Sequence, residues 1–311
     1  MPNLIKKEFL EELAKRFGAP RKLPGSESLF EVGSNAVRLY FRYSKRHPDN
    51  RTFFGIRKID LQCLEGHPAL LCFAWDGQRE PLFVPFHEFE EIFAGLTPAS
   101  DGQFKAQVFE TQETTELYIA NAGRFNVEGF MGWRVLEDFV QSSGLRVPEL
   151  SHSQVQTLLG GIGFVKGFDI WIPSNDRLSL DRNLVPTLQL ARELPSALAP
   201  IRNIAEEVDV IWLERGSGLP LAFYEVEHST PIYSGLLRFN DVHLIFQKNT
   251  LRFGIVATHD RRSLFVRQLE RPTFKASGLR EVCTFLEYDN VYGWHQRMKE
   301  GGQQNEKKQT A

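Results

Sequence analysis

Two apolar segments with carboxylates inside them constrain this chain more than any other feature. Residues 208–213 (Val-Asp-Val-Ile-Trp-Leu) and 221–228 (Leu-Ala-Phe-Tyr-Glu-Val-Glu-His) are rich in branched and aromatic residues, which is typical of strands inside a sheet. Residues two apart on a strand share a face, so Glu225 and Glu227 are expected to project together. If the two strands are antiparallel and in register, Asp209 joins them.

Three carboxylates at one edge of an apolar sheet repel one another unless a cation lies among them. Oxygen ligands without nearby His or Cys pairs favour Mg2+ or Mn2+ over Zn2+. An alternative stays open: Glu225 and Glu227 could lie on the solvated face of an edge strand, with Asp209 in a turn. The apolar residues around the two glutamates leave little polar pattern for a solvated strand, which favours the metal site.

An Asp on one strand followed by Glu-x-Glu on the next resembles the PD-(D/E)xK superfamily of restriction-endonuclease-like nucleases, with Glu227 where Lys is more common. The resemblance covers about residues 150–295. It implies that Asp209, Glu225 and the Val226 carbonyl hold Mg2+, which polarises a phosphate oxygen and lowers the pKa of a bound water. It also implies that Glu227 binds a second metal or orients the attacking water.

The helix expected after residue 150 is the second place to look for a metal ligand. Ser151 or Ser153 can cap it. In the resembling family this helix often contributes another acidic residue. Here Gln154 and Gln156 occupy the corresponding positions, and Gln154 is the possible helix contributor.

The whole chain is predicted to be an α/β (α+β) protein in three parts. Residues 1–145 form a β-rich DNA-recognition domain, residues 150–298 a nuclease domain with a restriction-endonuclease-like mixed sheet flanked by helices, and residues 299–311 a polar, disordered tail. Apolar residues at helical spacing predict a helix over residues 3–17, and period-two alternation predicts strands from residue 35. Helical turns are expected near residues 54–64 and 188–194.

Basic residues gather in two stretches. Residues 34–58 hold seven bases against Asp49 alone, and residues 260–280 hold six against two acids. Each stretch is either a solvated face or a DNA-facing surface, because arginines can meet both phosphates and guanine edges. The candidate DNA-binding residues are Arg38, Arg42, Lys45, Arg46, Arg51, Arg57, Arg238, Arg261 and Arg262.

Composition adds few constraints. The net charge of −2 says nothing in favour of nucleic acid, so a basic surface has to be local. The three cysteines lack the spacing of a disulfide framework or a zinc site, which favours free thiols in a reducing compartment. No apolar run approaches membrane-spanning length, so a soluble, cytoplasmic protein is expected.

These features together predict a Mg2+-dependent (or Mn2+-dependent) endonuclease that hydrolyses phosphodiester bonds of double-stranded DNA, with restriction of foreign DNA as the role that the resemblance implies. One centre per chain favours a homodimer for cutting both strands. Two alternatives stay open: a catalytically inactive DNA-binding protein with a nuclease fold, and a nuclease acting on RNA.

Overall fold

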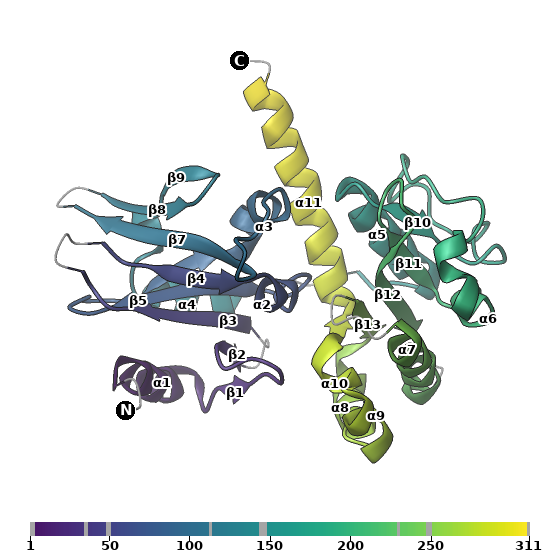
Figure 1. Ribbon diagram of the computed structural model, residues 1–311, viewed down its shortest axis with the longest axis horizontal. Helices are drawn as coiled ribbons and strands as arrows, with labels where there is room; N and C mark the ends of the chain where they lie inside the picture. Colours follow the sequence, from purple (N-terminus) through teal and green to yellow (C-terminus); the bar gives the residue numbers. More distant parts are fainter. Residues whose placement is uncertain are drawn as a thin grey trace. The chain divides into compact units, whose positions relative to one another are not determined.

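The computed structural model describes residues 4–33, 37–47, 51–111, 114–142, 148–228, 231–246 and 251–309. The chain divides into two compact units, Met1–Leu145 and Arg146–Ala311. The described residues form three sheets flanked by helices, so the architecture is mixed α/β (Figure 1). Among them, no helix combines the length and the apolar character that crossing a membrane requires.

The first unit contains a five-stranded sheet of order β1-β2-β3-β5-β6 and a four-stranded sheet of order β4-β7-β8-β9. The strands are β1 (Arg21–Lys22), β2 (Leu29–Val32), β3 (Val37–Ser44), β4 (Phe54–Arg57), β5 (Ala69–Trp75), β6 (Leu82–Pro85), β7 (Gln103–Glu110), β8 (Thr115–Ile119) and β9 (Gly123–Asn126). The helical segments are α1 (Leu4–Phe17), α2 (Lys58–Gln62), α3 (Phe86–Ala94), η1 (Glu128–Phe130) and α4 (Trp133–Ser142).

Strand β3 alternates as predicted, yet both of its faces are buried. Phe41 stacks on Phe9 of α1, at a ring-centroid distance of 4.5 Å, while Tyr40 packs on the opposite face in the same cluster as Phe54 of β4. The four-stranded sheet therefore covers the face that also carries Arg38. Residues 54–57, expected to be helical, instead form β4 because they pair with β7.

The second unit contains one five-stranded sheet of order β10-β11-β12-β13-β14. The strands are β10 (Asp169–Trp171), β11 (Val210–Leu213), β12 (Pro220–Glu227), β13 (Arg252–Ala257) and β14 (Cys283–Glu287). The helical segments are α5 (His152–Val165), η2 (Ser196–Ile201), α6 (Arg202–Ala205), α7 (Ile232–Phe246), η3 (His259–Arg261), α8 (Arg262–Leu269), α9 (Pro272–Ser277), α10 (Leu279–Val282) and α11 (Tyr288–Gln309).

Helices cover both faces of this sheet, so its central strands are buried. Residues of α5 and α11 pack with Trp212 and Tyr224 on one face, and residues of α7 pack with Phe223 on the other. Strands β10, β11 and β12 are antiparallel, whereas β12, β13 and β14 are parallel. Gly163 permits the close approach of α5, since a Cβ there would lie 2.6 Å from side-chain atoms of Ile170 and Trp212.

One segment of the second unit differs from the sequence-based expectation. Residues 188–194 are not helical: Leu188 and Leu194 each reach an apolar cluster from an irregular chain, and the helical turn comes later, as η2. Helix α11 includes residues 299–309, which belong to the segment expected to be a tail. Lys, Glu and Gln, which are frequent in that stretch, are favourable helix formers.

Candidate active site

Two glutamates of β12 lie inside the protein. Glu225 and Glu227 are each 2% exposed, and β12 is the central strand of its sheet. The alternative of a solvated edge strand is therefore wrong. Gly235 of α7 makes room for both side chains, because a Cβ there would lie 2.9 Å from Oε1 of Glu227 and 3.2 Å from Cγ of Glu225.

Asp209 immediately precedes β11, at the level of Glu225. The pairing of Val210 with Tyr224 sets this register. Oδ2 of Asp209 accepts a hydrogen bond of 2.7 Å from the backbone amide of Val226, so the carboxylate is anchored to the neighbouring strand between the two glutamates. The structure thus brings Asp209 to the strand that carries Glu225 and Glu227.

Helix α5 supplies two further contacts to Asp209. Nε2 of Gln156 lies 3.3 Å from Oδ1 of Asp209, and Nε2 of His152 lies 3.4 Å from the same oxygen. His152 and Gln156 are four residues apart, so they share one face of the helix. The hydrogen bond to Asp209 raises the pKa of His152 above its ordinary value, against the opposing effect of burial.

Of the two glutamines of α5, Gln156 reaches Asp209, whereas Gln154 was the possible contributor expected from the sequence. Gln154 instead forms a capping box with Ser151, and its side-chain nitrogen donates to Asp181 at 3.1 Å. Gln156 is 1% exposed and also donates to Oδ2 of Asp176, at 3.0 Å. Asp176 lies in the loop after β10. Its sequence is typical of a turn and does not predict that it shares the donor Gln156 with Asp209.

Glu225 is paired with an arginine of α7. Nε of Arg238 lies 2.7 Å from Oε1 and Nη2 lies 2.9 Å from Oε2, which is a bidentate ion pair. Burial raises the pKa of Glu225 to about 8. The charges of Asp209 and Glu227 act in the same direction, and Arg238 opposes them. Arg238, a predicted DNA-binding residue, therefore neutralises a candidate catalytic carboxylate.

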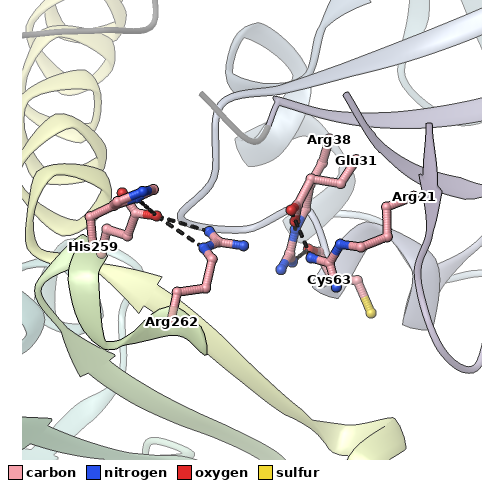
Figure 2. A network of polar contacts seen from close by, with 7 residues as sticks. Arg21, Glu31, Arg38, Cys63, His259 and Arg262 are labelled. Carbon is pink, nitrogen blue, oxygen red and sulfur yellow. Dashed lines mark hydrogen bonds and ion pairs between the residues drawn. The ribbon is translucent and has the colours of Figure 1, made fainter. Parts of the chain in front are cut away.

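Two other predicted DNA-binding arginines brace the ends of strands. Nη1 of Arg261 donates to the carbonyl of Glu227 at 3.0 Å and to that of His228 at 2.9 Å. Arg262 contacts Glu287, which also accepts from His259 (Figure 2). Both guanidinium groups thus make contacts within the second unit.

In the first unit, Arg38, a predicted DNA-binding residue, is buried. It is 6% exposed, donates to the backbone carbonyl of Cys63 and lies 3.9 Å from the carboxylate of Glu31 (Figure 2). Glu31 also pairs with Arg21 at 2.7 Å. The four-stranded sheet covers this face of β3. The alternation of residues along β3 alone does not predict that both faces of the strand are buried.

The other predicted DNA-binding residues of the first unit are more accessible. Lys45 and Arg51 are exposed, and Arg46 is half-buried and pairs with Glu110 at 2.9 Å. Arg42 is half-buried over the ring of Tyr40, and Arg57 forms a bidentate pair with Asp60. Asp49, the one acid of this basic stretch, lies outside the described residues.

The donor chemistry around Asp209 fits a divalent cation, because carboxylate oxygens are hard ligands. A bound cation would also relieve the repulsion between neighbouring carboxylates. Within the part of the chain that the structure describes, however, no three His, Cys, Asp or Glu side chains gather closely enough to hold a metal ion. Arg238 holds both oxygens of Glu225, and Asp209 accepts from Val226 and Gln156. A cation here would have to compete with the guanidinium of Arg238.

Comparisons with known proteins point to a single class of enzyme. The family described as the type II restriction enzyme NmeDI C-terminal domain matches residues 140–302, more than half of the chain. The type II restriction enzyme NmeDI of Neisseria meningitidis serogroup C is 33% identical over 134 residues, which is 40% of this chain and 37% of that enzyme. The match thus spans little more than a third of the relative.

Proposed function

This chain belongs to the family described as the type II restriction enzyme NmeDI C-terminal domain, and on that premise we propose that it is a DNA endonuclease of restriction–modification type. One observation carries the proposal. Within the matched segment, the carboxylate of Asp209 is anchored to β12 between two buried glutamates, Glu225 and Glu227. Carboxylates gathered at the end of a central strand suit metal-assisted hydrolysis of a phosphodiester.

The proposed centre is of the PD-(D/E)xK kind and uses Mg2+ or Mn2+. Asp209, Glu225 and the carbonyl of Val226 would hold the cation, which when bound polarises a phosphate oxygen of the scissile bond. Gln156 and the amide of Val226 orient Asp209. Glu227 would bind a second metal or orient the attacking water.

The first unit is proposed to recognise the target. Lys45 and Arg51 are exposed and Arg46 is half-buried, and together they offer positive charge to phosphates of double-stranded DNA. The partner is therefore DNA, and a homodimer would present one centre to each strand. A restriction-endonuclease-like fold for residues 150–298 belongs to the same proposal.

The second candidate is a DNA-binding protein that has the same domain without cleavage. It is favoured by the bidentate pairing of Arg238 with Glu225, and by the fact that the described side chains form no three-ligand group. In that case Arg238 replaces the cation permanently.

Cleavage of plasmid and genomic DNA with Mg2+ or Mn2+ tests the proposal. Wild type is compared with Asp209→Ala and Glu225→Ala, and with Asp241→Ala, which removes an exposed acid of α7 as the matched control. Discrete fragments from wild type and from Asp241→Ala, but from neither site variant, are the expected result. EDTA should abolish them.

The other outcomes separate the alternatives. Cleavage that survives both site substitutions would place the centre elsewhere. Tight DNA binding without cleavage of modified or unmodified DNA would favour the binding protein. Preferential cleavage of RNA in a competition with DNA would show that the substrate is RNA.

A further inference from the structure

Tyr288 lies at the same edge of the sheet as the candidate carboxylates. It is the first residue of α11 and directly follows β14. Along the parallel strands Glu227 is level with Ala257, and Ala257 is level with Glu287. Tyr288 is thus one residue beyond the level of Glu227, at the carboxyl edge, where ligands bind in sheets with parallel strands.

The side chain of Tyr288 is buried, and its hydroxyl has no partner. The residue is 5% exposed, packs in the same apolar cluster as Val226, and stacks on the ring of His228 at a centroid distance of 6.3 Å. Its Oη is buried and makes no hydrogen bond to any residue that the structure describes. An unpaired buried hydroxyl destabilises a protein, so it calls for an explanation.

The charges around this hydroxyl belong to the candidate centre. Burial raises the pKa of Tyr288 to about 12; the positive charge of Arg261 opposes that shift, and the negative charges of Asp209 and Glu227 add to it. The phenol therefore keeps its proton near neutral pH and is available as a donor. Its natural acceptor is an anionic oxygen brought in by a ligand.

We propose that Tyr288 is a further catalytic residue, whose hydroxyl donates a hydrogen bond to a phosphodiester oxygen of DNA bound beside Asp209. This inference rests on the proposed nuclease function. A hydrogen bond to a charged oxygen is stronger than one to a neutral group, so its loss should slow cleavage by about 10- to 100-fold. A purely structural hydroxyl without a partner predicts no such loss.

Tyr288→Phe removes the hydroxyl alone and keeps the ring. Tyr292→Phe is the matched control, since Tyr292 is one helical turn further along α11 and is half-buried against the same apolar cluster. Single-turnover cleavage of plasmid DNA should fall about 10- to 100-fold in Tyr288→Phe and stay at the wild-type rate in Tyr292→Phe. The melting temperature of Tyr288→Phe should be equal to or above that of wild type. A wild-type cleavage rate in Tyr288→Phe would overturn the proposal.

A binding measurement separates this proposal from the nuclease function itself. The chain is labelled with 3-fluorotyrosine, and the fluorine resonance of Tyr288 is assigned by its disappearance in Tyr288→Phe. Short random-sequence duplex DNA is added with Ca2+, and the resonance of Tyr288 should shift while that of Tyr292 does not. If wild type cuts no DNA but the resonance shifts, the phosphate contact stands and the nuclease proposal fails. An unshifted resonance in the presence of bound DNA overturns the role of Tyr288.

Discussion

The guanidinium of Arg238 contacts both carboxylate oxygens of Glu225, at 2.7 Å and 2.9 Å. The glutamate is almost fully buried, so this pair decides whether a negative charge can exist at the end of the central strand. The same pair is the main argument for the binding-protein alternative. Its energetics can be measured without any assumption about function.

Arg238→Met should destabilise the protein by about 3 kcal/mol, because it leaves a buried carboxylate without its partner. Urea unfolding measures the loss. Arg202→Met is the control, since its pair with Glu206 is half exposed and should contribute less than about 1 kcal/mol. Glu225→Gln in the Arg238→Met background should recover part of the loss. Equal effects of Arg238→Met and Arg202→Met would contradict the reasoning.

Gln156→Ala should lower DNA cleavage about 10-fold and leave DNA affinity unchanged, because Asp209 loses a donor that orients it. The control is Gln154→Ala, two residues away on the same helix. That variant loses part of a capping box and should be destabilised by about 1 kcal/mol while cleaving normally. Cleavage rates and unfolding curves of both variants check this. A larger cleavage defect in Gln154→Ala would restore the original assignment.

Arg38 and Lys45 should behave in opposite ways. Arg38→Ala leaves the buried carboxylate of Glu31 with less compensation, so the free energy of unfolding should fall by about 2 kcal/mol. Lys45→Ala should leave stability unchanged, weaken DNA binding, and reduce the slope of log affinity against log salt by about 1. Fluorescence anisotropy at several salt concentrations measures the slope. An unchanged slope would remove Lys45 from the proposed DNA surface.

His295 should make stability depend on pH below neutrality. Burial, aided by the charge of Lys299, lowers its pKa from 6.5 to about 4. Between these pH values the unfolded chain binds more protons than the folded one. The free energy of unfolding is therefore highest above pH 6.5 and decreases as the pH falls from 6.5 to about 4. His295→Leu should flatten the decline by on the order of 2 kcal/mol, measured by urea unfolding across this window. If the free energies of unfolding of variant and wild type decline in parallel with falling pH, His295 does not cause the decline.

The sequence by itself predicted the two central strands and the side-chain periodicity along them. Apolar residues flank Glu225 and Glu227 so closely that β12 had to be buried, and the spacing of two placed both glutamates on one face. The cap of α5 at Ser151 followed from local hydrogen bonding in the same way. Such features depend on neighbours in the chain, and these are visible in a single sequence.

Only the tertiary structure decided which polar residues meet. Gln156 rather than Gln154 reaches Asp209, because the rotation of α5 against the sheet is set by packing around Trp212 and not by the helix sequence. Arg38 is buried because a second sheet covers β3, although its strand position resembles that of an exposed base. The contact between Asp176 and Gln156 likewise joins a loop to a helix that is distant from it in the sequence. Partners that are distant in the chain meet through packing, and a local pattern contains no information about packing.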